Sequence, residues 1–122
     1  MNIEEFRDYC LSFKGVTEET PVGPNTLVYK VGAPGGKPRM FALGSIDVFD
    51  FINLKCDPEK AIDLRERYQG VRPGWHMNKK LWNSVDVEGE FSDDLRREWI
   101  KDSYDLMVAS LPKKDQVYFT KK

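Results

Sequence analysis

Three β-rich segments follow one another in the first half of the chain, and the links between them are short. Residues 26–31 and 40–43 flank a turn cluster of Gly and Pro at residues 32–38, which predicts a β-hairpin with a long flexible tip. Residues 51–56 alternate apolar and polar side chains, which predicts a third strand with one half-solvated face. Parallel strands need long crossover connections, so these short links favour an antiparallel sheet.

Two helices have recognisable starts. Asn2 and Glu5 have the spacing of a capping box in front of apolar residues at the helical period, which predicts a helix over residues 3–14. Asp57 suits the N-cap, and Pro58 suits the first helical position, of a second helix. Both predictions rest on local signals alone.

The rest of the chain completes an α+β pattern. Residues 81–87 predict a strand, and Ser92 can cap a third helix that Pro112 stops. A short final strand is predicted at residues 117–119. This order is typical of an α+β domain in which an antiparallel sheet packs against helices in two layers, and we expect residues 1–122 to form a single domain.

The composition excludes several broad classes of protein. Hydrophobic residues make up 40% of the 122 residues, which is enough for a packed core. The start of the chain lacks the apolar segment of a secretory signal, and no apolar run approaches the about 20 residues of a membrane span. Cys10 and Cys56 lack metal-ligand spacing and are typical of a reducing compartment. We therefore expect a cytoplasmic protein that does not enter the membrane.

Charge is nearly balanced overall but is grouped along the chain. The formal net charge is −1, so bulk charge does not indicate a nucleic-acid-binding protein. Residues 21–46 and 69–83 each carry three cations and no anion, and residues 107–122 carry four cations and one anion. The segments between them are acidic. Such grouping can produce a basic face and an acidic face on a near-neutral protein.

Residues 71–83 form the most distinctive segment. They hold the only histidine, two of the three tryptophans, three cations and no acid. Their Pro-Gly and Asn-Lys steps are typical of turns, and turns presented by a scaffold often carry function. His76 has no second histidine to join it, so a structural role is favoured over a metal ligand. The sequence contains no nucleophile motif or metal set that would indicate an enzyme.

Several segments together match the pattern of one known family, and they are spread over most of the chain, at residues 21–23, 41–43, 56–58, 68–79, 82–85 and 103–106. On these residues the chain resembles the MmcQ/YjbR-like family of small bacterial proteins. The resemblance implies a frataxin/CyaY-like fold and a DNA-binding double wing, in which two hairpin loops grip a duplex. It implies neither a reaction nor a cofactor. Trp75 stands where Tyr is common, which keeps an aromatic surface but removes a hydroxyl.

The candidate nucleic-acid contacts lie around these two loops. Their cations are expected to contact phosphates and so release counterions. Two asparagines are expected to orient the second wing, and His76 to stack on an unpaired base. The predicted contacts are Lys30, Lys37, Arg39, Arg72, His76, Asn78, Lys79, Lys80 and Asn83. The expected partner is double-stranded DNA, bound by a monomer without catalysis, cofactor or metal.

A second hypothesis uses the same central face without nucleic acid. Residues 72–83 can form a small-ligand or protein-interaction module, with aromatic and amide side chains lining a shallow pocket. Geometry separates the two hypotheses. Loops on one side with merged cations favour DNA, whereas convergence of Arg72, His76 and Asn78 into a concave pocket favours a ligand. By analogy with frataxin, the acidic first 20 residues are a weaker candidate for a hard cation.

Overall fold

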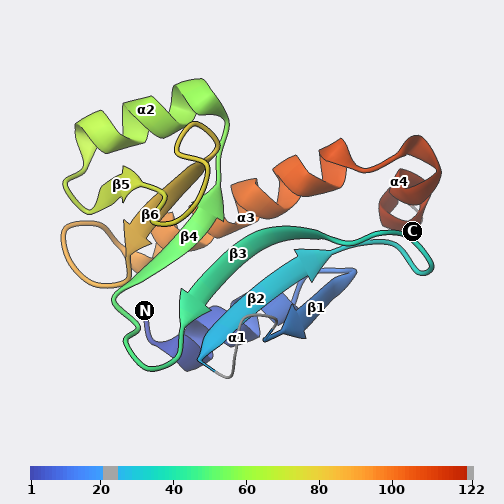
Figure 1. Ribbon diagram of the computed structural model, residues 1–122, viewed down its shortest axis with the longest axis horizontal. Helices are drawn as coiled ribbons and strands as arrows, with labels where there is room; N and C mark the ends of the chain where they lie inside the picture. Colours follow the sequence, from blue (N-terminus) through green and yellow to red (C-terminus); the bar gives the residue numbers. More distant parts are fainter. Residues whose placement is uncertain (21–24, 121–122) are drawn as a thin grey trace.

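A computed structural model describes residues 1–20 and 25–120. These residues form one antiparallel sheet with the strand order β1-β2-β3-β4-β6-β5, together with four helices (Figure 1). The predicted α+β class is therefore confirmed, whereas residues 21–23 of the family pattern lie outside the described residues. The elements are α1 (Ile3–Leu11), β1 (Val16–Glu19), β2 (Thr26–Val31), β3 (Arg39–Ser45), β4 (Phe51–Lys55), α2 (Pro58–Arg67), β5 (Val71–Pro73), β6 (Trp82–Asp86), α3 (Asp93–Ser110) and α4 (Lys113–Thr120).

The helices cover one face of the sheet and enclose the core. α1 and α3 cross behind the sheet in Figure 1, and α2 lies along its β5–β6 end. Phe6 of α1 and Ile100 of α3 join Tyr29, Phe41 and Ile52 of the sheet in one cluster, and all five are fully buried. Burial of apolar surface contributes about 25 cal/mol per Å², so this cluster is a main source of stability.

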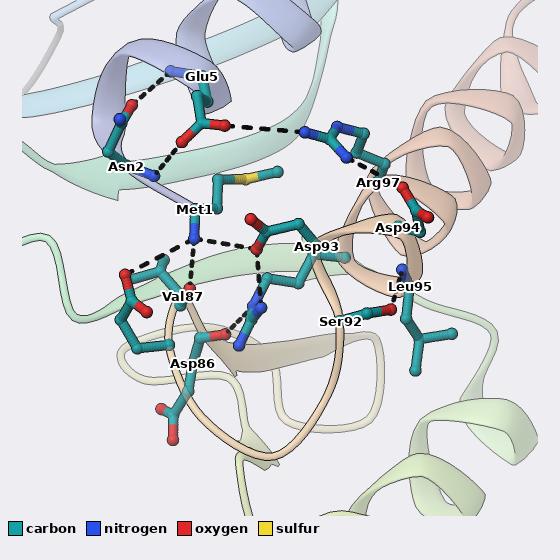
Figure 2. Close-up of polar contacts among 12 residues, drawn as sticks. Met1, Asn2, Glu5, Asp86, Val87, Ser92, Asp93, Asp94, Leu95 and Arg97 are labelled. Atoms are coloured by element: carbon teal, nitrogen blue, oxygen red, sulfur yellow. Dashed lines mark hydrogen bonds and ion pairs between the residues drawn. The ribbon is translucent and has the colours of Figure 1, made fainter.

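Capping contacts fix where the helices begin. Asn2 Oδ1 accepts a hydrogen bond from Glu5 N at 2.8 Å, and the Glu5 carboxylate accepts one from Asn2 N at 3.1 Å, so the predicted capping box is confirmed (Figure 2). At the start of α3, Ser92 Oγ accepts from Leu95 N at 3.2 Å. Helix α1 ends at Leu11 rather than at the predicted residue 14, because the chain turns there towards β1.

The first turns of α1 and α3 lie beside the end of β6 (Figure 2). The amino group of Met1 donates to Val87 O at 2.8 Å and lies 2.9 Å from the Asp93 carboxylate. Arg96 donates to Asp86 O at 2.7 Å and to Asp93 at 2.8 Å. The hydrogen bond from the Met1 amino group, more than that from Arg96, lowers the pKa of Asp93. These contacts tie both helix starts to the sheet.

The predicted half-solvated face of β4 is confirmed at Phe51 and Lys55, which are half-buried, but a loop covers the same face at Asn53. Residues 74–76 fold across this face, where Asn53 is only 4% exposed. Asn53 Nδ2 donates to Trp75 O at 3.2 Å, and Ser84 Oγ accepts from Trp75 N at 2.9 Å and donates to Asn53 Oδ1. The polar groups beneath the loop are thus hydrogen bonded, as buried polar groups must be.

Two elements differ from the sequence prediction at the same end of the molecule. Strand β1 was not predicted, and it pairs with β2 in the register Val16 to Val31. The predicted strand at residues 117–119 is wrong, since these residues belong to α4. Their β-branched and aromatic side chains favour a strand, but Phe119 packs close to Gly15. Tertiary contacts override local propensity here.

Candidate nucleic-acid interface

The loop between β5 and β6, residues 74–81, is held down onto the protein. Lys79 Nζ donates to Gly74 O at 3.0 Å, which closes the loop on itself. The Arg65 guanidinium of α2 donates to Lys79 O at 2.6 Å and to Asn83 Oδ1 at 2.8 Å. The predicted second wing is therefore anchored to α2 on one side and to the sheet on the other, and Lys79 has its ammonium group engaged within the loop.

Asn83 belongs to the interior rather than to the binding surface. Its side chain is 2% exposed, and its amide nitrogen donates to Ala61 O at 3.3 Å while its oxygen accepts from Arg65. The prediction that Asn83 contacts nucleic acid is therefore wrong for this conformation. Its buried amide links β6 to α2 instead.

Asn78 and His76 remain exposed on the loop. Asn78 Oδ1 accepts from Lys80 N at 3.0 Å, which stabilises a local turn. His76 has a left-handed backbone, with φ of 57°, and its ring centroid lies 3.9 Å from that of Trp75. Trp75 is 61% exposed, so this pair forms an aromatic surface on the loop.

Two of the predicted phosphate contacts are already neutralised by carboxylates. Arg72 lies 2.7 Å from Asp86, with its guanidinium over the Phe51 ring. Lys30 lies 3.0 Å from Glu19 on the neighbouring strand. Each pair would have to open, or share its cation, for a phosphate to bind. These residues therefore contribute little net positive charge to the surface.

The two predicted wings lie in different parts of the molecule. Figure 1 places the β2–β3 tip at one end of the long axis beside α4, and the β5–β6 loop towards the other end beside α2. The tips of the two wings therefore do not lie side by side. Arg72 is turned to Asp86 and Asn78 to the backbone of Lys80, so the side chains expected to converge into a pocket point to different partners.

α4 packs against the β2–β3 tip. A Cβ atom at Gly36 would lie 2.8 Å from the Asp115 carboxylate, so the tip and α4 are in close contact. Lys14 Nζ lies 4.5 Å from the centre of the Tyr118 ring. Arg39 donates to Ser110 O at 2.6 Å, next to the connection that leads into α4. The C-terminal segment thus joins the hairpin tip in one surface.

This surface concentrates positive charge, and we call it the basic end. Residues 14–15, 32–39 and 113–120 supply five exposed cations and one carboxylate, Asp115, which is 9% exposed. The cations are Lys14, Lys37, Arg39, Lys113 and Lys114. Because they come from three separate segments, only the fold brings them together.

The position of Lys14 is set by a buried phenol. Tyr104 of α3 donates its hydroxyl to Lys14 O at 2.6 Å. Burial raises the pKa of Tyr104 to about 12, so the hydroxyl keeps its proton at neutral pH. The backbone that presents Lys14 is therefore hydrogen bonded to the core.

Sequence reasoning found two of these five cations, Lys37 and Arg39, and missed Lys14, Lys113 and Lys114. The available signal was the basic composition of residues 107–122, which carry four cations and one anion. In residues 1–20 and 25–120, no group of three His, Cys, Asp or Glu side chains lies close enough to hold a metal ion. No helix among them is both long and apolar enough to cross a bilayer.

The chain matches one protein family over most of its length. The family model described as YjbR matches residues 11–106. The chain belongs to the YjbR family. YbdF of Escherichia coli O157:H7 is 42% identical over 97 residues, covering 79% of this chain and 75% of that protein. YjbR of Escherichia coli K12 is 28% identical over 113 residues and covers 92% of each chain.

Two solved structures are similar to this chain in both sequence and fold. Deinococcus radiodurans protein DR2400, which carries the DUF419 domain, has a TM-score of 0.87 and 33% identity, covering 94% of this chain and 85% of that one. A Pseudomonas syringae protein has a TM-score of 0.71 and 26% identity, covering 88% of this chain and 99% of that one. The expected YjbR-type α+β fold is therefore confirmed.

Proposed function

We propose that this YjbR-family protein binds the phosphate backbone of double-stranded DNA through its basic end, without catalysis. The observation that carries the proposal is the packing of α4, with Lys113 and Lys114, against the β2–β3 tip that bears Lys37. DNA would thus contact one hairpin and a flanking helix, rather than two separate hairpin wings.

The shape of the basic end suits a duplex. The DNA major groove is about 12 Å wide and admits a two-stranded β-ribbon, so the β2–β3 tip can enter it. Lysines on the hairpin and on α4 would then reach phosphates beside the groove. Contacts of this kind position a protein without reading sequence, so we expect little base preference.

A second candidate partner is single-stranded DNA at the β5–β6 loop. The observation in its favour is Trp75, which is 61% exposed and lies beside His76. An exposed indole can stack on an unpaired base, which is worth about 1–3 kcal/mol per base. Among the nearby cations of the described residues, Lys79 and Arg72 are already bonded, and only the exposed Lys80 has a side chain with no bonded partner. The positive charge available to bind phosphates is therefore smaller at this loop than at the basic end.

Fluorescence anisotropy with labelled duplex and single-stranded DNA tests the proposal. We expect a duplex dissociation constant of about 10⁻⁴ M at physiological salt, weakening steeply as salt rises. Lys113→Gln/Lys114→Gln should weaken binding and make the slope of log K against log salt shallower by about 1 for each lost contact. The matched control is Lys79→Gln/Lys80→Gln, which removes the same charge from two consecutive lysines of the β5–β6 loop.

The outcomes are distinct. An effect confined to the Lys113/Lys114 pair supports the basic end. Equal effects from both pairs support the two-wing arrangement, and a larger effect from Lys79/Lys80 supports the aromatic loop. Absence of saturable binding even at low salt would refute DNA binding by this protein.

A further inference from the structure

A cavity lies between α2 and α3, above β4, and shares only Arg39, at its outer part, with the basic end. Its volume is about 170 Å³, and its walls include the apolar side chains of Leu54, Leu64, Val85, Trp99 and Leu106. The half-buried thiol of Cys56 lies in the same wall. A cavity of about 150 Å³ lined by apolar side chains holds a benzene molecule, so this one matches a group of that size.

The cavity continues into an outer hollow of about 290 Å³ near the end of α3. Lys55, Cys56, Asp57 and Leu106 line both spaces, so the two form one groove. Arg39 lines the outer part from β3. The groove therefore combines apolar walls with charged side chains, an arrangement typical of sites for small amphipathic molecules. Lys60 and Asp102 line the inner part, Arg39 lines the outer part, and Lys55 and Asp57 line both.

The carboxylates around the groove have bonded partners, whereas two of its cations have no carboxylate partner among the described residues. The two carboxylates have partners: Asp102 lies 2.8 Å from Lys60 Nζ, and Asp57 caps α2 by accepting from Lys60 N at 3.3 Å. Lys55 has no carboxylate partner within the described part of the chain, and its ammonium group lies 5.4 Å from the centre of the Trp82 ring. Among the described residues, Arg39 bonds to the neutral Ser110 alone. Within the described residues, the outer groove therefore holds two cations that no carboxylate pairs, beside the single carboxylate of Asp57.

We propose that this groove binds a small carboxylic acid whose apolar part is about the size of a phenyl ring. The ring occupies the cavity between α2 and α3, and the carboxylate lies in the outer hollow against Lys55, with Arg39 beside it. A short linker between ring and carboxylate spans the two parts. A neutral ligand of the same shape would leave the cationic outer part unused.

The thiol of Cys56 can report whether the groove is occupied, and we assign it no catalytic role. Burial raises the pKa of the Cys56 thiol, so at neutral pH it remains largely protonated and weakly nucleophilic. It is nevertheless half-exposed, whereas Cys10 is fully buried. An alkylating reagent should therefore modify Cys56 first, and a ligand in the groove should slow that reaction.

The probe is 3-phenylpropionate, compared with its neutral analogue 3-phenylpropanamide. Backbone amide NMR shifts of the full chain are followed during titration with each. We expect saturable shifts at residues 54–57 and 99–106 with a dissociation constant of about 1 mM or tighter, as ligands of this size allow. Binding of the amide should be at least several-fold weaker. Alkylation of Cys56 should slow in proportion to occupancy.

Variants separate the two parts of the site. Lys55→Met keeps the aliphatic stem over Trp82 but removes the charge, and should weaken 3-phenylpropionate binding about five- to ten-fold. Lys80→Met, on the exposed β5–β6 loop, is the matched control and should bind as wild type. Leu106→Phe adds bulk to the cavity wall and should abolish binding while the NMR spectrum stays dispersed.

Three results would overturn the proposal. Absence of saturable shifts at millimolar ligand would exclude the site. Equal affinity for acid and amide, unchanged in Lys55→Met, would remove the carboxylate from the assignment. Shifts that map to Lys14, Lys37, Lys113 and Lys114 of the basic end instead of the groove would show nonspecific attraction of an anion.

Discussion

The side-chain amide of Asn83 joins three parts of the chain. Its oxygen accepts from Arg65 of α2, its nitrogen donates to the carbonyl of Ala61, and Arg65 in turn holds the carbonyl of Lys79. Since the group is buried, each lost hydrogen bond leaves a polar partner without water to replace it. The β5–β6 loop therefore depends on this amide.

Asn83→Ala should lower the free energy of unfolding by about 1–3 kcal/mol, the usual cost of leaving buried polar partners unsatisfied. Urea unfolding measures it. Asn78→Ala, on the exposed face of the β5–β6 loop, is the control and should change stability by about 0.5 kcal/mol or less. Similar small effects for both would mean that Asn83 is not a structural link.

Glu18 of β1 is a half-buried carboxylate that accepts hydrogen bonds from two side chains. Burial acts to raise its pKa, but the hydrogen bonds from Arg7 and Tyr29 and the charge of Arg7 outweigh it and hold the pKa below its usual value. Burial also raises the pKa of Tyr29, so its hydroxyl remains a donor. The charged form of Glu18 is therefore favoured in the folded protein.

A carboxylate with a lowered folded pKa stabilises the protein above its unfolded pKa of about 4.3, and this contribution is lost as pH falls through the folded value. The destabilisation caused by Glu18→Gln should accordingly be larger at pH about 7 than at pH about 3. Urea unfolding at both pH values provides the measurement. In an Arg7→Gln background the pH dependence should shrink, and a penalty that does not vary with pH would contradict the account.

Single residues also show which contacts can be predicted from the sequence and which cannot. The caps at Asn2 and Ser92 were predictable because a cap involves neighbours three residues apart. The pairing of Arg72 with Asp86 was not, because it depends on the register of β5 against β6. The same limit explains why Asn83 was assigned to the surface.

At the scale of elements, the turn into β1 controls how α4 docks. Gly15 has φ of +76°, and a Cβ atom there would lie 2.7 Å from Gly32 O and 2.9 Å from the Phe119 ring. Gly35 on the hairpin tip has nearly the same φ, +77°, with nothing within 4 Å. The two glycines thus share a left-handed φ and differ in their surroundings.

Gly15→Ala should therefore destabilise the protein by about 2–4 kcal/mol, from left-handed strain and from overpacking against a backbone oxygen. Gly35→Ala has the strain alone and should cost about 1 kcal/mol or less. Thermal and urea unfolding of both variants gives the comparison. Equal losses would indicate that close packing of α4 at Gly15 contributes nothing.

Elements with strong local signals were predicted well, and α4 was not. Asp57 with Pro58, and the Gly/Pro cluster of the hairpin, specify their structures within a few residues. Residues 117–119 have β-favouring side chains, but Phe119 gains its packing only as part of a helix against Gly15. A contact between segments about 100 residues apart cannot be seen in local patterns.

At the scale of the whole molecule, the fold redistributes charge that nearly cancels in the sequence. The formal net charge is −1, yet residues 14–15, 32–39 and 113–120 together place five exposed cations around one carboxylate. Several other cations, including Arg72, Lys30 and Lys60, are paired with acids. Local potential, rather than net charge, steers an anionic partner.

The measurement that tests the central claim most directly is NMR mapping of duplex DNA binding on the full chain at low salt. The account predicts shifts concentrated at residues 32–39 and 113–120, with residues 72–80 little affected and the shifts reversed as salt increases. Shifts centred on residues 72–80, or none at any concentration of DNA, would contradict it.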